Sequence, residues 1–320
     1  MTFVRALFSR TPWLGPLAAL VLVYALFAAL RPDSFASAET FSTMAQKTVV
    51  VGIAAVGMTL IIILGGIDLS VGSVVALTTV VTALLLKRGA STFSAIVGAI
   101  VVATICGLMN GLLVTRLRVV PFIATLGTMS VLRGAAKGLA NEQKIDVDAR
   151  GLDTLLSSLP EGKRWMLFPA GVWIALLVAL LAALLLRYTR LGRHIFAIGS
   201  NEQTARLCGI AVNRVKVTVY ALAAALTGLA GLMEFSRLTV GDPTDSGGLE
   251  LNVIAAVVVG GGSLSGGEGS IPGALTGAFL MTVINEGCTH VGLPNWVEQI
   301  ITGVIIVVAA ALDRARHART

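Results

Sequence analysis

The sequence predicts an all-α polytopic membrane protein, and three observations lead to this fold class. Only 13% of the 320 residues are charged, whereas soluble domains carry about 25%. Hydrophobic residues make up 56% of the chain, and the mean hydropathy is +0.88. The apolar residues form long unbroken runs, unlike the alternating strands of about 10 residues that build a membrane β-barrel. These observations exclude an ordinary soluble enzyme, a disordered protein and a domain held by a single anchor.

Ten apolar segments are candidate transmembrane helices, because a helix needs about 20 apolar residues to cross a bilayer. The first segment follows the cations Arg5 and Arg10, as the apolar core of a signal peptide does. Its length of about 18 residues suits a membrane span better than a signal peptide. The second, eighth and ninth segments are short or rich in glycine. The ten are Trp13–Leu30, Val49–Leu64, Val71–Leu86, Ser94–Val114, Val119–Leu139, Met166–Leu186, Val215–Phe235, Leu249–Val259, Ile271–Gly287 and Trp296–Leu312.

Lysine and arginine predict the orientation of these segments, since cytoplasmic loops carry an excess of both residues. With both termini in the cytoplasm, the inner segments hold most of the cations and the outer segments are mixed or acidic; only Lys87 and Arg88 depart from this pattern. The inner cations are Arg5, Arg10, Arg116, Arg118, Arg187, Arg190, Arg193, Arg206, Arg214, Lys216, Arg314, Arg316 and Arg319. The outer acids are Asp33, Glu39, Glu142, Asp146, Asp148, Asp153, Glu161, Asp242, Asp245 and Glu250.

The net charge of +7 follows from this topology. Nucleic-acid binding is not expected, because no basic run carries interleaved aromatic residues. A single transmembrane domain is expected over residues 1–320, with an outer loop at 140–165 and an inner loop at 187–214 as its largest extramembrane pieces. An enzyme that supplied energy to this protein would therefore be another chain. Cys106, Cys208 and Cys288 are isolated and the histidines are scattered, so a catalytic metal site is not expected.

One acidic residue, Asp68, lies in the glycine-flanked segment Gly65–Gly72 between two apolar segments. Glycine allows a tight turn, and Asp or Ser can cap the helix that follows. The pattern fits a capped turn, or a conformational role for Asp68, because an acid at the membrane edge is costly unless it has a partner. A proton relay is disfavoured, since no second intramembrane acid accompanies Asp68.

The inner loop contains a short predicted helix from Ser200 to Gly209. Ser200 and Gln203 have the spacing of a capping box, Glu202 falls in the first turn, and Gly209 can end the helix. An isolated helix of about two turns is not stable in water, so it needs a packing surface, either the membrane face or a partner protein. The small residues Ala205 and Gly209 suit close docking to such a surface.

A glycine-dense segment at residues 259–273 separates the eighth and ninth predicted spans. Within it, Leu264–Glu268 resembles the LSGGQ signature of ABC ATPases. Such an ATPase also needs a phosphate loop of the type GxxxxGK[S/T], which occurs nowhere in the chain, and there is no room here for a nucleotide-binding domain. We therefore expect an irregular inner connection at which helices break, buried in protein or next to water.

Several polar residues fall inside predicted spans, where interhelical hydrogen bonds of about 0.6 kcal/mol are their ordinary role. The alternative is a polar pathway for a hydrophilic solute. Thr125 and Thr128 are three residues apart and share a helix face. Glu234, Asn252 and Glu286 lie near predicted outer ends, where water would solvate them. The full set is Asn110, Thr125, Thr128, Glu234, Asn252, Asn285 and Glu286.

Four motifs, in this order, resemble those of permease subunits of bacterial ribose-type sugar ABC importers, over roughly residues 40–312. They are Gly65–Gly72, Asn110–Val114 with Val120–Met129, Ala197–Ile210 and Gly260–Gly273. The resemblance implies about ten helices in a fold related to that of vitamin B12-type importer permeases. It also implies a multi-pass protein of the bacterial inner membrane, surrounded by lipid. Two permeases, either two copies or this chain and a sibling, would enclose a central pathway.

The resemblance further implies partners and residue roles. A periplasmic binding protein would deliver the solute, and a cytoplasmic ABC ATPase would bind ATP and Mg²⁺, so the chain itself would carry no cofactor and would not be an enzyme. The ATPase would contact a coupling helix formed by Ser200, Asn201, Glu202, Gln203, Ala205, Arg206 and Gly209. The expected pathway or conformational residues are Asp68, Asn110, Phe122, Thr125, Thr128, Asn252 and Asn285.

The favoured function is therefore the permease of an ATP-driven, binding-protein-dependent importer of a ribose-like monosaccharide or polyol. The same type of importer for a non-sugar solute, such as a nucleoside or a signalling furanone, is an alternative that the sequence does not separate from it. A secondary carrier is disfavoured because the spans lack paired acids at the midplane. An intramembrane enzyme is disfavoured because no His, Asp and Glu cluster is present.

Overall fold

The computed structural model describes residues 14–157 and 166–317, and helices make up most of this part of the chain. Trp13, Arg5, Arg10, Glu161 and Arg319, which entered the sequence predictions, lie outside it. The helices are α2 (Leu14–Leu30), α3 (Pro32–Phe35), α4 (Ala38–Ile63), α5 (Val71–Lys87), α6 (Thr92–Arg116), α7 (Pro121–Leu139), α8 (Ala170–Tyr188), α9 (Arg190–Ser200), α10 (Glu202–Leu207), α11 (Val212–Leu238), α12 (Leu249–Val259), α13 (Ile271–Val291) and α14 (Asn295–His317), with a 3₁₀ turn at Leu152–Leu155. Two short strands, β1 (Ile145–Asp146) and β2 (Val240–Gly241), pair antiparallel.

Each of the ten segments predicted to be transmembrane overlaps one helix, namely α2, α4 to α8 or α11 to α14. Among the described helices, α4, α6, α8, α11 and α14 are long and apolar enough to cross a membrane. The protein is therefore an all-α membrane protein. Helix α12 has 11 residues, which gives about 16 Å against the roughly 30 Å of a bilayer core. It does not cross by itself, so the number of spans stays a prediction.

The prediction of a short second span was wrong, because α4 runs for 26 residues from Ala38 to Ile63. Ser37 caps its start, with the backbone N–H of Thr40 donating to the Ser37 hydroxyl at 3.0 Å. The first turns of α4 carry polar residues such as Glu39 and Lys47, which interrupt the apolar pattern. The apolar run therefore marked only the part of the helix that lies deep in the protein.

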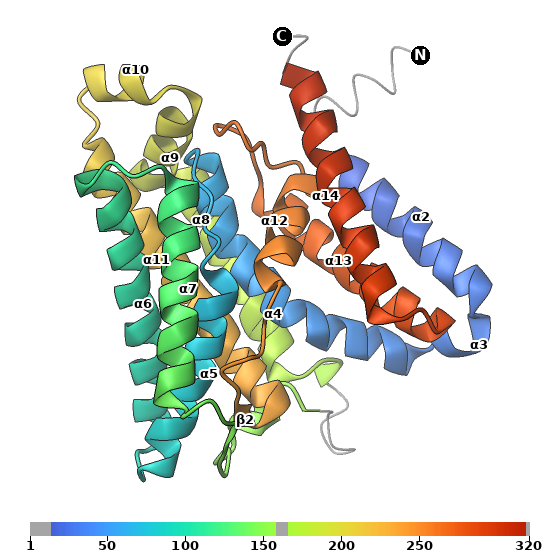
Figure 1. The fold of residues 1–320 in the computed structure, drawn as a ribbon. Helices are drawn as coiled ribbons and strands as arrows, with labels where there is room; N and C mark the ends of the chain where they lie inside the picture. Colours follow the sequence, from blue (N-terminus) through green and yellow to red (C-terminus); the bar gives the residue numbers. More distant parts are fainter. Residues whose placement is uncertain (1–13, 158–165, 318–320) are drawn as a thin grey trace, which may run out of the picture.

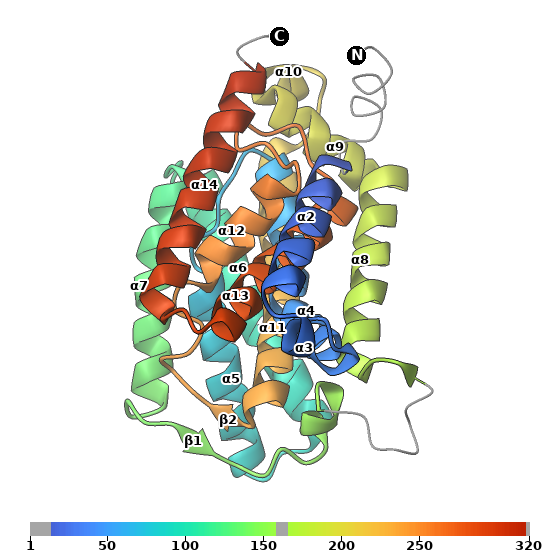
Figure 2. The same ribbon diagram turned by 90° about the vertical axis from the view of Figure 1, so that its right-hand side faces the viewer.

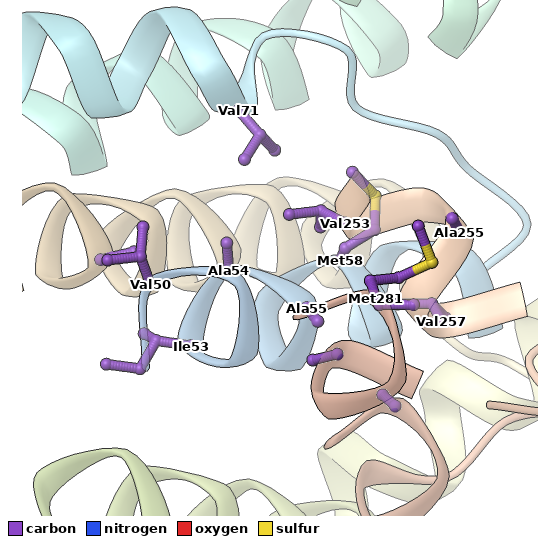
Figure 3. Packing of buried hydrophobic residues seen from close by; sticks show 14 of the residues in the cluster. Val50, Ile53, Ala54, Ala55, Met58, Val71, Val253, Ala255, Val257 and Met281 are labelled. Atoms are coloured by element: carbon purple, nitrogen blue, oxygen red, sulfur yellow. The ribbon is translucent and has the colours of Figure 1, made fainter. Parts of the chain in front are cut away.

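Helix α4 lies at the centre of the core, and its apolar residues pack against helices that come much later in the chain. Figure 3 shows Met58 of α4 and Met281 of α13 next to Val253 and Ala255 of α12. All four side chains are buried. The core therefore joins the second transmembrane helix to the C-terminal third of the protein.

Small residues allow the helix backbones to approach closely, as is common between helices in membranes. A Cβ atom on Gly107 of α6 would lie 2.3 Å from the carbonyl oxygen of Tyr220 in α11. A Cβ atom on Gly277 of α13 would lie 1.9 Å from the carbonyl oxygen of Ala256 in α12. Neither position has room for a side chain, so these glycines set how tightly α6 packs on α11 and α12 on α13.

The predicted inner and outer segments lie at opposite ends of the molecule (Figures 1 and 2). One end, called here the α10 end, carries α9, α10, the connection from α6 to α7 and the last turns of α14. At the other, called here the β end, β1 of the predicted outer loop 140–165 pairs with β2, so that Ile145 lies opposite Gly241. The separation agrees with the charge pattern, which predicts that the α10 end is cytoplasmic.

Candidate functional site

The short helix α10 forms as predicted, but it begins one residue later than the capping-box pattern indicated. Ser200 is the last residue of α9, and Asn201 is the N-cap, its Oδ1 accepting from the backbone N–H of Thr204 at 2.8 Å. The extended backbone of Asn201 (φ −160°, ψ 103°) separates the two helices. Glu202 lies in the first turn, and the left-handed Gly209 (φ 83°) follows the end of α10, both as predicted. Gln203, predicted as the capping-box partner, lies in the first turn of α10.

Glu202 connects α10 to the long helix α11. Its Oε1 accepts from Arg206 at 2.9 Å within α10, and its Oε2 accepts from Lys216 of α11 at 2.7 Å. The hydrogen bond from Lys216 is the main reason why the pKa of the Glu202 carboxyl lies below its ordinary value. The predicted coupling residues Glu202 and Arg206 therefore share one ionic network with Lys216, whose role the sequence did not indicate.

The surface of α10 is divided into a buried side and an exposed side. Ala205 is buried in a cluster with Ile195 of α9 and Val215 of α11, so part of the packing surface that α10 needs comes from its own chain. Leu207 is 89% exposed, the largest exposed fraction among the large apolar side chains of the described residues. Leu207 was not among the predicted residues; the signal for it was a single large apolar residue in an otherwise polar helix.

A cleft of about 500 Å³ lies beside α10, between the α6–α7 connection and the start of α11. Arg118, Arg206 and Lys216 line it together with Glu202. The cleft brings residues 114–121 next to residues 202–216, two segments that the charge pattern placed on the same inner side. The α10 end thus presents a basic depression next to the exposed Leu207.

Three chain segments meet closely below α9, at a place called here the glycine junction (Gly65, Gly199, Gly266 and Gly267). A Cβ atom on Gly199 would lie 1.7 Å from the carbonyl oxygen of Ile63 at the end of α4. The N–H of Gly267 donates to that same oxygen at 2.8 Å. A Cβ atom on Gly266 would lie 2.8 Å from the Gly199 oxygen and 3.0 Å from the Gly65 Cα. The predicted irregular connection after α12 therefore contacts both α9 and the Asp68 segment.

Asp68 is buried in a polar cluster rather than at a solvated turn. Its Oδ1 accepts from the backbone N–H and the hydroxyl of Ser70 at 2.8 and 2.6 Å. The Asn110 side-chain N–H₂ donates to the Ser70 hydroxyl at 2.9 Å and to Asp68 Oδ2 at 3.4 Å. Ser70 is the N-cap residue of α5 but makes no side-chain capping bond. Asp68 thus has hydrogen-bond partners, as a buried acid in a membrane protein requires. One of them is Asn110, the second predicted residue of this cluster.

The remaining predicted pathway residues of α7 divide into buried and exposed positions. Thr125 donates to the carbonyl oxygen of Ile67 at 3.2 Å, which links α7 to the Asp68 cluster. Thr128 is also buried and donates to the Thr125 carbonyl at 3.2 Å, so the two threonines do share a face. Phe122 is 45% exposed on the surface of α7. The Asp68 cluster therefore gathers Asn110 and Thr125 but not Phe122.

The last two predicted pathway residues, Asn252 and Asn285, line one cavity of about 600 Å³ towards the β end. Glu234 and Glu286 also line it, but the expectation that they are solvated was wrong. Both are buried, and each is paired with a cation that offsets the cost of burying its charge. Glu234 pairs with Arg237, and Glu286 pairs with Lys47. Lys47 was not predicted to lie here, because the predicted second span started after it. This cavity is called here the outer cavity.

Comparison with known proteins gives consistent matches along most of the chain. The family model described as the branched-chain amino acid transport system / permease component matches residues 40–310. The ribose import permease protein RbsC of Escherichia coli K12 is 39% identical over 301 residues, covering 94% of this chain and 93% of that protein.

Two further relatives match at similar coverage. The L-arabinose ABC transporter permease protein AraH of Azospirillum brasilense is 33% identical, covering 93% of this chain and 87% of that protein. The autoinducer 2 import system permease protein LsrC of Yersinia pseudotuberculosis is 34% identical, covering 92% of this chain and 83% of that protein. No solved structure matches the chain.

Proposed function

The chain belongs to the family of branched-chain amino acid transport system permease components, and we propose that it is the membrane-spanning subunit of an ATP-driven, binding-protein-dependent sugar importer. The match with permeases named for ribose and L-arabinose along nearly the whole chain supports a sugar as the solute. A relative named for autoinducer 2 import has comparable identity. A non-sugar solute is therefore the second candidate.

The contact with the ATPase is proposed to lie on α10. The observation that carries this assignment is Leu207, an apolar side chain that is 89% exposed beside a basic cleft. A side chain of this kind gains by being covered, since burying a leucine is worth about 1.5–3 kcal/mol. The charged surroundings would orient the partner, while Leu207 would supply the apolar contact.

Two connections in the chain would carry movement of α10 to the membrane helices. The first is the ion pair from Glu202 to Lys216, which ties α10 to α11. The second passes from α9 through the glycine junction to the end of α4 and the Asp68 segment. Because these contacts are short and partly backbone to backbone, displacement of α9 and α10 would shift both helices. ATP hydrolysis in the partner would in this way change which side of the pathway is open.

The remaining parts of the proposal follow from the family. The α10 end would face the cytoplasm of a bacterial cell, and a periplasmic binding protein would meet the β end. Two permeases, of this chain or of this chain and a sibling, would form the pathway, in a fold related to that of vitamin B12-type importers. ATP and Mg²⁺ would be bound by the ATPase, so that the chain needs no cofactor of its own.

Co-purification tests the ATPase contact directly. Tagged chain is extracted from native membranes in mild detergent and the associated proteins are identified by mass spectrometry. We expect an ABC ATPase with the unaltered chain, and at least tenfold less of it with Leu207→Ala, since that substitution removes about 1.5–3 kcal/mol of apolar contact. Phe93→Ala is the matched control, because Phe93 is a large apolar side chain that is 75% exposed but lies at the start of α6 towards the β end.

The result also separates the alternatives. Absence of any ATPase from the unaltered chain, at normal membrane abundance, would contradict the importer assignment and favour a secondary carrier. Full recovery of the ATPase with Leu207→Ala would remove α10 as the contact but leave the importer assignment intact. Uptake assays with the reconstituted complex, comparing D-ribose with the autoinducer 2 furanone, then decide between the two solute classes.

A further inference from the structure

We propose that the outer cavity is a binding site for a neutral polyhydroxylated solute, located within a single permease chain. The inference rests on the proposed function, because it assigns a place to the solute of that importer. It is drawn from the position of the cavity, the composition of its wall and the arrangement of its charges.

The outer cavity forms where five helices meet near the β end. The last turns of α11 and α13 and the first turns of α12 and α14 reach it, together with α4 at Lys47 and Val50. Helix α12 is too short to cross the membrane by itself, and Leu249 and Asn252 of its first turn line the cavity. A solute entering from the β end would therefore meet this cavity before the deeper part of the protein. Its volume of about 600 Å³ lies within the range of ligand pockets.

The wall of the outer cavity offers both hydrogen-bond donors and acceptors. Asn252 and Asn285 each carry an amide, and the hydroxyl residues Ser246, Thr282 and Thr289 also line the cavity. The side-chain carbonyl oxygen of Asn285 is buried and has no hydrogen-bond partner among the described residues. A sugar hydroxyl both donates and accepts, so it suits such a wall better than an ion or an apolar ligand does. Leu249 and Val50 supply the apolar patch that the C–H face of a sugar ring needs.

The charged residues of the cavity wall are arranged in pairs. Lys47 Nζ lies 2.5 Å from Glu286 Oε1, and Arg237 Nε donates to Glu234 Oε2 at 3.1 Å. Each pair neutralises itself and still presents oxygen lone pairs and N–H groups to a ligand. Asp245 and Glu298 line the cavity as well, which leaves a formal excess of two negative charges. The site should therefore accept neutral sugars and repel anions such as sugar phosphates.

One part of the cavity wall is held in place by a side chain from another helix. Arg133 of α7 donates to the carbonyl oxygens of Asp245 and Pro243 at 2.6 and 3.1 Å. These contacts fix the connection between β2 and α12, which contributes Asp245 and Ser246 to the wall. The polar wall is therefore assembled in advance, as binding with little loss of conformational freedom requires.

Thiol labelling tests this site without assuming that transport works. Asn252→Cys and Asn285→Cys are made in a Cys208→Ser background, because Cys208 is the exposed native thiol and Cys106 and Cys288 are buried. The complete importer complex in right-side-out vesicles is treated with membrane-impermeant methanethiosulfonates, one cationic and one anionic. Gln143→Cys is the matched control, since Gln143 is exposed near the β end but does not line the cavity.

We expect the cationic reagent to modify both cavity cysteines at least fivefold faster than the anionic one, relative to the ratio at Gln143→Cys. Saturating D-ribose, L-arabinose, D-xylose or myo-inositol should slow labelling of at least one cavity cysteine about tenfold, whereas D-ribose 5-phosphate should have no effect. If none of these four neutral compounds slows the labelling, the inference is overturned, whatever the complex transports. Equal protection by the sugar phosphate would overturn the assignment to neutral solutes.

Uptake by variants separates this inference from the proposed function. Asn285→Ala and Asn252→Ala should each lower kcat/KM for the protecting sugar about tenfold, as expected for loss of one hydrogen-bonding group. If ATP-dependent sugar uptake occurs but both variants transport like the unaltered chain, the outer cavity is not the site and the proposed function stands. If uptake does not depend on ATP, the proposed function fails instead.

Discussion

A single carboxylate, that of Glu202, carries the polar connection between α10 and the rest of the protein. It accepts from Arg206 in its own helix and from Lys216 in α11. The second of these contacts joins two helices, so its loss would free α10 to move independently of α11. The contribution to stability is small, because ion pairs near the surface contribute about 0.2–1 kcal/mol. We therefore expect the main effect of Glu202 on coupling rather than on folding.

The titration of Glu202 leads to a prediction about pH. Because the hydrogen bond from Lys216 lowers the pKa of this carboxyl in the folded protein below its ordinary value of 4.5, its stabilisation is complete above that value. It is lost as pH falls through the lowered pKa. Thermal unfolding in detergent should show Glu202→Gln melting about 1 °C below the unaltered chain at pH 7, with the difference shrinking as the pH falls through the lowered pKa.

The control for this comparison is Glu142→Gln, which removes a negative charge from the exposed surface at the β end. If the difference between Glu202→Gln and the unaltered chain did not shrink as the pH was lowered, the ion pair would not be its cause. A difference in melting temperature that grew towards acid pH would contradict the lowered pKa of Glu202.

At the scale of residues, the sequence predicted which residues matter better than it predicted their partners. It singled out Asp68 and Asn110 separately, but the 42 positions between them hid the hydrogen bond that joins them. It placed the N-cap of α10 at Ser200, because Ser200 and Gln203 fit a capping box; Asn201 is an equally good cap and its extended backbone decides the matter. Lys47, Lys216 and Leu207 were missed, because their roles depend on which helices are neighbours.

At the scale of elements, the glycine junction is where α4, α9 and the connection before α13 meet. Gly199 has no room for a side chain, since its Cβ would lie 1.7 Å from the Ile63 carbonyl oxygen. The junction is therefore a close backbone contact between α9 and the core.

Substitution of Gly199 tests this link. We expect Gly199→Ala to lower the free energy of unfolding by about 2 kcal/mol or more, because the added methyl group has to displace the α4 backbone. Gly127→Ala in α7 is the control, since nothing lies within 4 Å of the Gly127 position, and it should change stability by less than about 1 kcal/mol. Thermal unfolding, monitored by size-exclusion chromatography of the heated protein, compares the stability of the two variants.

An equal effect of the two substitutions would show that the close contact at Gly199 is not restrictive. If Gly199→Ala abolished uptake but left the stability unchanged, the junction would transmit movement without contributing to stability.

The elements themselves were predicted well where they are apolar throughout. Helix α12 was predicted with its observed bounds, Leu249–Val259, because glycines on both sides end the apolar run. Helix α9 was not predicted, because its residues are partly polar and it is stabilised by packing on α8 and α10 rather than by an apolar span. The start of α4 was misplaced for a related reason, since its first turns hold polar residues whose partners lie in α13.

At the scale of the whole molecule, the two ends differ in structure as the charge pattern predicted. The α10 end carries α9, α10 and the basic connections, and the β end carries the paired strands. The sequence could predict this separation because a loop's charge reflects its side of the membrane. The short length of α12 was also predicted, because glycines on both sides limit its apolar run to Leu249–Val259.

The native cysteines allow a test of orientation without any substitution. Cys208 is exposed at the α10 end, whereas Cys106 and Cys288 are buried. A membrane-impermeant maleimide should therefore label one thiol per chain in inside-out vesicles and none in right-side-out vesicles. Labelling only in right-side-out vesicles would place the α10 end outside and contradict the proposed docking of the ATPase. Denatured protein, in which all three thiols react, provides the control for reagent activity.

The central position of α4 has a consequence for how the protein is made. This helix is the second long helix to leave the ribosome, yet its buried face packs on α11, α12 and α13, which follow roughly 200 residues later. At about 5–20 residues per second, that delay is on the order of 10–40 s. During this interval the buried face of α4, with Thr48 and Thr59, has no partners from the C-terminal third of the chain. Packing of α4 is therefore completed only after the last third of the chain has been translated.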